Sequence, residues 1–134
     1  MSTKNLVSRA KGFTRTKGFT LIEVLIVVSI IGLLAAIAIP NYIHTRNKGY
    51  CSLVERDADA VAKGLAGYFG NPYHVALPDV KDVAAVANPV VISGDPNEII
   101  YIVVKDKSNR CPDDYQRSMD GWDMTANTYT KEME

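Results

Sequence analysis

Histidine and cysteine are scarce in this sequence, with two of each among 134 residues. The chain shows no nucleophile–base–acid set, no phosphate-binding loop and no metal-ligand spacing. Its two cysteines, Cys51 and Cys111, are too few for a zinc site and lack the C-x-x-C spacing of a redox motif. We therefore expect a protein that is not an enzyme and holds no cofactor.

Charged residues are absent from positions 24–45, between Glu23 and Arg46. Residues 24–39 are almost entirely Val, Ile, Leu and Ala. At ~1.5 Å rise per residue, a helix over residues 19–39 spans ~30 Å, the thickness of a bilayer core. The apolar part of a secretory signal peptide is shorter, at ~7–15 residues, and a core helix of a soluble protein rarely has so unbroken an apolar run. The sequence therefore predicts a membrane-spanning helix.

Acidic residues are absent from residues 1–18, which contain five Lys and Arg. The other ten basic residues and all fifteen acidic residues lie in 19–134, so the formal net charge of that part is −5. Because basic residues flank membrane helices on the cytoplasmic side, we expect a cytoplasmic N-terminus and a periplasmic C-terminal part. The net negative charge of residues 19–134 argues against nucleic-acid binding by bulk charge.

The helical pattern continues beyond the apolar run. Pro40 predicts a kink or a stop, and Gly32 loosens the same segment. Further on, apolar residues recur at helical spacing on one face, and Gly70, Asn71 and Pro72 end the pattern. This stripe consists of Val54, Ala58, Val61, Ala62, Leu65 and Phe69.

The C-terminal part is expected to form a small antiparallel sheet. "PVVIS" and "IIYIVV" are β-branched runs joined by "GDPNE", a pattern typical of a hairpin. One more strand is expected within residues 122–130, and residues 74–89 are expected to form a loop with a helical turn or two. The predicted fold class is α+β: a long N-terminal helix, membrane-spanning and then amphipathic, packed on a small antiparallel sheet.

The stretch "KGFTLIEVLIVVSIIGLLAAIAIPNY", residues 17–42, resembles the N-terminus of a type IV pilin or a related pseudopilin. The resemblance implies that a prepilin peptidase cuts between Gly18 and Phe19 and methylates the new amino terminus. It divides the chain into a leader (1–18), a transmembrane and assembly helix (19–43) and a globular domain (44–134). "KGFT" also occurs at 11–14, but a cut there would leave Arg15 and Lys17 at the start of the membrane helix.

Glu23 is a carboxylate inside an apolar helix, which by default indicates a functional site. Cleavage would give Phe19 an α-amino group, which has a reference pKa of ~8 and is cationic at neutral pH. The resemblance implies that Glu23 pairs with this amine on a neighbouring subunit. The alternative is a Glu23 that reaches the headgroups or pairs with its own amine. The resemblance also implies that the segment between Gly32 and Pro40 loses helicity in a filament.

Cys51 and Cys111 would form a disulfide if the C-terminal part faces an oxidising space, and would otherwise stay free thiols. Such a bond departs from the common pilin pattern, in which both cysteines lie in the C-terminal part. The receptor-binding loop bounded by that usual disulfide therefore cannot be transferred to this chain.

Four aspartates, Asp113, Asp114, Asp120 and Asp123, cluster in a polar, turn-rich stretch. Carboxylate oxygens in such a loop are calcium ligands, and pseudopilins resemble this in having a C-terminal calcium loop. The spacing fits no EF-hand, and a solvated acidic loop is the favoured interpretation.

The sequence is accordingly interpreted as a pilus subunit that forms a homopolymer. Expected partners are the prepilin peptidase, an inner-membrane platform, an assembly ATPase and an outer-membrane secretin. The precursor would sit in the inner membrane and the polymer would be extracellular, serving adhesion, motility or DNA uptake. Alternatives left open are a type II secretion pseudopilin, a minor pilin, a single-pass anchor for a binding domain, and a DNA receptor using Lys105, Lys107 and Arg110.

Overall fold

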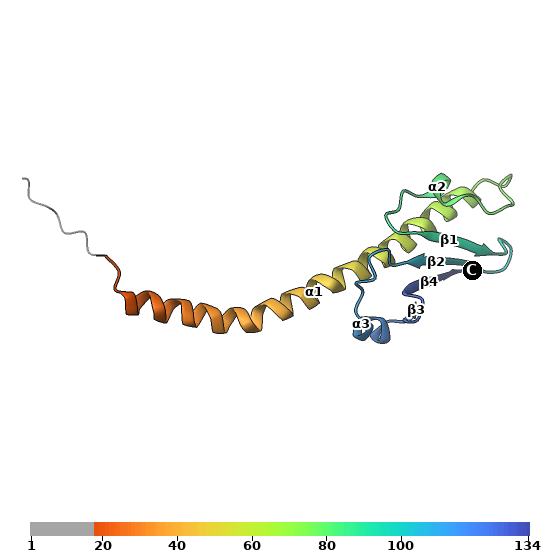
Figure 1. Cartoon of the computed structure of the whole chain (residues 1–134). Helices are drawn as coiled ribbons and strands as arrows, with labels where there is room; N and C mark the ends of the chain where they lie inside the picture. Colours follow the sequence, from red (N-terminus) through yellow and green to blue (C-terminus); the bar gives the residue numbers. More distant parts are fainter. Residues whose placement is uncertain (1–17) are drawn as a thin grey trace, which may run out of the picture. The chain divides into compact units, whose positions relative to one another are not determined.

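The computed structural model describes residues 18–134 (Figure 1). The predicted leader and the first "KGFT" copy therefore lie outside the described residues, apart from Gly18. The chain divides into a first compact unit that ends at Ile37 and a second unit, Ala38–Glu134. Helix α1 (Leu21–Phe69) contributes residues to both units.

Helix α1 continues through Pro40, so the stop that was left open beside a kink does not occur there, and the predicted long helix is confirmed. Proline removes one backbone donor, but strong helix formers such as alanine and leucine precede it in residues 33–38 and favour continuation. The predicted end is confirmed, because α1 ends at Phe69. There the amide N–H of Gly70 donates to the Ala66 carbonyl at 3.1 Å, and Asn71 and Pro72 follow.

Four strands form one antiparallel sheet in the order β1-β2-β4-β3. The predicted hairpin is confirmed as β1 (Val90–Gly94) and β2 (Ile100–Lys105). Gly94 has a φ of 111° at the turn, and a Cβ there would lie 2.2 Å from the Ile99 carbonyl oxygen. The turn therefore requires glycine.

The single strand expected within residues 122–130 is in fact a second hairpin, made of β3 (Trp122–Asp123) and β4 (Thr128–Met133). The turn between them includes Asn127 in a left-handed conformation with a φ of 52°. Asparagine tolerates this conformation better than most residues, so the chain reverses where the sequence pattern looked continuous.

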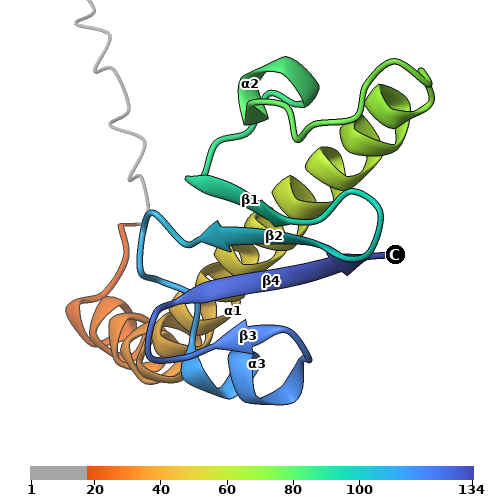
Figure 2. The same ribbon diagram turned by 90° about the vertical axis from the view of Figure 1, so that its right-hand side faces the viewer.

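The core lies between the sheet and the second part of α1 (Figure 2). Strand β2 alternates, with Ile100, Ile102 and Val104 buried against the helix. Four members of the predicted helical stripe are fully buried opposite them, and Ala62 and Phe69 are partly buried at the margin. These four are Val54, Ala58, Val61 and Leu65. The α+β fold class is confirmed.

Two short helices cover the edges of this core. Helix α2 (Val80–Val83) is the helical turn expected within the loop. Helix α3 (Asp113–Ser118) was not predicted, because its polar sequence "DDYQRS" has no apolar periodicity.

Candidate functional site

The apolar helix begins with a reciprocal pair of hydrogen bonds between Thr20 and Glu23. The Glu23 backbone N–H donates to Thr20 Oγ1 at 3.3 Å, and the Thr20 N–H donates to Glu23 Oε2 at 3.4 Å. This arrangement is a capping box, in which both side chains satisfy backbone donors at a helix start. The sequence analysis missed it, although the T-x-x-E spacing before an apolar run is its signature.

The capping box directs the Glu23 carboxylate toward the start of the helix. Gly18 and Phe19 precede the first turn in irregular structure, and Phe19 is 83% exposed. Only Oε2 of Glu23 accepts a hydrogen bond from the described residues 18–134. The second carboxylate oxygen is therefore available to another donor at the position where the predicted cleavage would create an amino group.

The rest of this segment presents apolar side chains that no other part of the described residues covers. Within α1 an 18-residue window has a mean hydropathy of 2.9 and no buried residue, so the helix is long and apolar enough to cross a membrane. Apart from the neighbouring helix backbone, no atom of the described residues lies within 4 Å of the position that a Cβ on Gly32 would take. The apolar surface of this helix would be covered either by lipid or by other helices.

Cys51 and Cys111 form a disulfide, which confirms the predicted pairing. Their Cα atoms are 5.0 Å apart, and both residues are buried. The bond joins α1 to the segment that leads into α3. It closes a loop of chain with a sequence separation of 60.

Asp106 organises the segment that presents Cys111. This carboxylate is 1% exposed. Its Oδ1 accepts the Ser108 N–H and hydroxyl at 2.9 and 2.6 Å, and its Oδ2 accepts the N–H groups of Arg110 and Cys111 at 2.8 and 2.9 Å. Burial by itself would raise the pKa of Asp106, but these hydrogen bonds outweigh it and hold the pKa below its ordinary value of 3.8.

We predict that Asp106 makes the fold sensitive to acid. A pKa lowered by folding means that its stabilisation is present above the unfolded pKa, about 3.9, and is lost as pH falls through the folded value. Asp106→Asn should reduce stability at neutral pH by about 3 kcal/mol, because its NH2 group would face buried N–H donors. Between neutral pH and pH values below 4, the melting temperature of the wild type should fall. The melting temperature of the variant should fall less over the same range, because position 106 no longer takes up a proton.

The measurement is thermal unfolding of the full chain in detergent between pH 7 and pH 2, by circular dichroism. Asp120→Asn is the matched control, because Asp120 is exposed and its side chain accepts no hydrogen bond from the described part of the chain. Parallel pH curves for wild type and Asp106→Asn would contradict the assignment.

Three acids of α1 hold distant segments onto the helix. Glu55 accepts hydrogen bonds from the Tyr115 hydroxyl at 3.1 Å and from Trp122 Nε1 at 3.0 Å. Asp57 Oδ2 accepts from Ala87 N at 3.2 Å and from Asn88 N at 2.9 Å, and Asp59 pairs with Lys131. The sequence places these acids beside the apolar stripe but gives no signal for partners 30 or more residues away.

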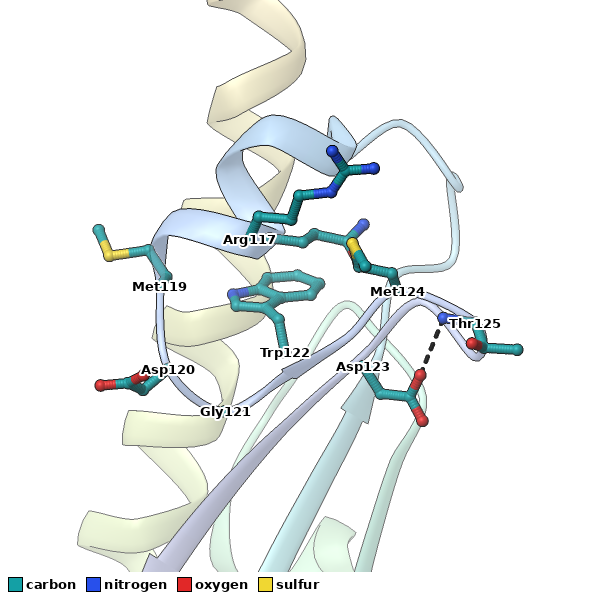
Figure 3. Close-up of a pocket in the computed structure, with 9 residues that line it drawn as sticks. Arg117, Met119, Asp120, Gly121, Trp122, Asp123, Met124 and Thr125 are labelled. Carbon is teal, nitrogen blue, oxygen red and sulfur yellow. Dashed lines mark hydrogen bonds between the residues drawn. The ribbon is translucent and has the colours of Figure 1, made fainter.

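The structure does not gather the four aspartates proposed as calcium ligands. Among residues 18–134 no three His, Cys, Asp or Glu side chains are arranged to hold a metal ion. Asp114 instead lies 3.2 Å from His44 Nε2 and 3.6 Å from Lys48 Nζ. Asp123 accepts the Thr125 N–H at 2.8 Å, and Asp120 points away on the other side of Trp122 (Figure 3).

The pocket in Figure 3 has a volume of 470 Å³ and lies around Trp122. Arg117, Met119 and Met124 line the pocket, with Met119 pointing away from the indole ring in Figure 3, and the indole N–H is already bonded to Glu55. Gln116 also lines the pocket, and its Oε1 is buried with no hydrogen-bond partner among residues 18–134. The other polar side chains of the lining belong to Arg117, Asp120, Asp123 and Thr125.

Comparison with known proteins finds a family model and several relatives that each match part of the chain. Residues 13–39 match the family model for the prokaryotic N-terminal methylation motif. The chain is 46% identical over 55 residues to a type IV major pilin of Myxococcus xanthus, covering 41% of this chain and 25% of that protein. It is 37% identical over 76 residues to a type IV major pilin of Neisseria gonorrhoeae, covering 57% of this chain and 45% of that protein.

A third relative is the major component of a type IV narrow pilus of Thermus thermophilus, 44% identical over 52 residues, covering 39% of this chain and 45% of that protein. The chain thus spans between 25% and 45% of the length of these relatives. No solved structure matches the chain significantly.

Proposed function

We propose that this chain, whose N-terminal part is that of a type IV pilin with its prepilin leader, is a structural subunit of a pilus filament. The methylation motif and the similarity to major pilins of three organisms support this proposal. The observation that carries it is a Gly-Phe-Thr junction followed by Glu23 and an uncovered apolar helix. A structural role is consistent with a protein that is not an enzyme.

Processing would occur at the start of the apolar helix. A prepilin peptidase would cut between Gly18 and Phe19 and methylate the new amine, which stays cationic. Both residues are exposed and precede α1, so the peptide bond is not held in helical hydrogen bonds. The mature subunit would begin at Phe19, with a membrane and assembly helix over 19–43 and a globular domain over 44–134.

Glu23 would then guide assembly. In an apolar environment an unpaired carboxylate or ammonium group has a high desolvation free energy, and the two opposite charges attract each other strongly. An incoming subunit whose Phe19 amine meets Glu23 of a neighbour is therefore held at one axial register. Gly32 and Pro40 would let the segment between them unwind as the helices pack, because glycine increases the conformational freedom of the backbone and proline removes one helical hydrogen bond.

The precursor would lie in the inner membrane with its basic N-terminus in the cytoplasm and its globular domain in the periplasm. The disulfide is consistent with an oxidising space on that side. Assembly would require an inner-membrane platform, an ATPase and an outer-membrane secretin. The assembled polymer would be extracellular.

Intact-mass spectrometry on material sheared from cells tests this function. We expect a species running from residue 19 to 134, heavier than calculated by one methyl group and lighter by the two hydrogens lost in the disulfide. A mature species found only in the membrane fraction would favour a pseudopilin, a minor pilin or a membrane anchor. A species that retains residues 1–18 would refute the processing step.

A further inference from the structure

Exposed charges of opposite sign gather at opposite ends of the unit Ala38–Glu134. One end is formed by the end of α1, the β1–β2 turn and the C-terminus, as Figure 1 shows. Its segments 69–78, 93–100 and 132–134 contain four acidic residues and no Lys or Arg. We call this the acidic end; its charges are Asp95, Glu98, Glu132 and Glu134, all exposed.

The other end is formed by residues 44–51 of α1 and by the segment 105–114 that follows β2. It contains five Lys and Arg and three Asp. Asp106 is buried, Asp114 pairs with Lys48, and Asp113 is exposed. We call this the basic end; its exposed cations without an ion pair in the described residues are Arg46, Lys105, Lys107 and Arg110.

Protection of a sheet edge does not explain these cations. Lysine on an edge strand blunts unwanted strand pairing, but β2 lies inside the sheet between β1 and β4. Lys105 ends this interior strand, and Lys107 follows it in the loop. Their side chains make no hydrogen bond or ion pair with the described part of the chain, so folding of the unit does not account for them.

Apolar surface accompanies the charge at both ends. At the acidic end Tyr73 is 88% exposed and Val75 is 77% exposed, in the loop after α1. At the basic end a pocket of 380 Å³ lies between α1 and the segment after β2. Tyr50, Leu53 and Ala87 line its apolar side, and Lys107 lies at its margin.

We propose that the acidic end of one copy of this chain binds the basic end of the next, with Tyr73 seated in the pocket lined by Tyr50, Leu53 and Ala87. The two surfaces differ, so the contact is head-to-tail and leaves one free end of each kind. Repetition of such a contact generates an open filament. Complementary charge would set the orientation of the incoming copy and disfavour acidic-to-acidic contacts.

This inference rests on the proposed function, because it names a second contact between subunits of the same filament. The apolar helices supply the first contact, and it is the same for any related helix. The contact between the ends would be particular to this chain and would select its own copies over other subunits.

Charge reversal tests the contact in cells that assemble the full-length protein. The basic-end variant is Lys105→Glu with Lys107→Glu, and the acidic-end variant is Glu98→Lys with Glu134→Lys. Each should lower the yield of sheared filament by about fivefold or more, because like charges would then face each other. The variant that carries all four changes restores opposite charges and should return to within about twofold of the wild type.

Lys63→Glu is the matched control, because Lys63 is exposed on α1 outside both ends and makes no ion pair with the described residues, and its yield should be unchanged. The unassembled membrane pool and its disulfide are measured in parallel, so that a folding defect is recognised. Wild-type yields from both double variants, or no rescue in the fourfold variant, would overturn the contact while the proposed function stands. A wild type without filaments would overturn both. If the basic-end variant lost DNA binding while its filament yield stayed unchanged, the basic end would be assigned to nucleic-acid binding instead.

Discussion

Replacing Glu23 with alanine is expected to leave leader removal intact and to lower the yield of sheared filament by at least about tenfold. Removing one partner of a buried ion pair typically costs about 3–5 kcal/mol, which exceeds the 1.4 kcal/mol that corresponds to a factor of about ten in an equilibrium. The mature subunit should accumulate in the membrane. The measurement is the ratio of sheared to membrane-bound subunit by quantitative immunoblot, with the mass of the membrane form to confirm cleavage.

Glu23→Gln separates the two roles that Glu23 could have. Glutamine serves at this position of a capping box, so it would retain the hydrogen bond with the Thr20 N–H that Glu23 makes. It carries no charge and cannot form an ion pair with an amine. If pairing with the Phe19 amine guides assembly, Glu23→Gln should fail as Glu23→Ala does. Normal filament yield from the glutamine variant would show that the carboxylate acts only as a cap.

Replacing Cys51 with serine is expected to lower the stability of the globular part by about 4 kcal/mol, because the disulfide closes a long loop of the unfolded chain. For a domain of this size that loss corresponds to a fall in melting temperature of roughly 20 °C. The disulfide also fixes the segment between the Asp106 loop and α3 to helix α1, because Cys111 lies in that segment. Thermal unfolding of the full chain in detergent, with and without a reductant, measures it.

The double variant Cys51→Ser with Cys111→Ser is the control for an unpaired thiol. It should be as unstable as the single variant if the bond is what matters, and reductant should lower the wild type toward the same value. An unchanged melting temperature in Cys51→Ser would contradict the prediction. So would thiols that react with an alkylating agent in the untreated wild type.

Local spacing was sufficient to predict the helix and the start of the candidate site. The apolar run over residues 24–39, the i, i+4, i+7 stripe around Val61 and the β-branched runs beside "GDPNE" each reflect the period of one backbone conformation. The Gly18, Phe19 and Glu23 spacing is also local. These features do not depend on what lies elsewhere in the chain, so they can be predicted without the tertiary structure.

The wrong or missing elements were those whose local pattern is ambiguous. Helix α3 has no apolar periodicity and is held from outside, since Gln116 Nε2 donates to the Cys111 carbonyl at 3.0 Å and to Asn127 Oδ1 at 2.7 Å. Residues 122–130 mix strand formers with the turn residues Asp123 and Asn127, and the left-handed Asn127 marks where the chain reverses. Pro40 by itself left a kink and a stop open, and the helix formers of residues 33–38 favour the continuation that the structure has.

What the sequence by itself determined is therefore the N-terminal motif, the long helix with its buried face and the first hairpin, because backbone periodicity and turn chemistry act over a few residues. The tertiary structure alone decided which acids hold the fold together and where the charges gather. Glu55 accepts a hydrogen bond from Trp122 across 67 residues, and Asp57 accepts one from the Asn88 N–H across 31 residues. Such contacts depend on how distant segments pack, and a linear pattern contains no measure of that distance.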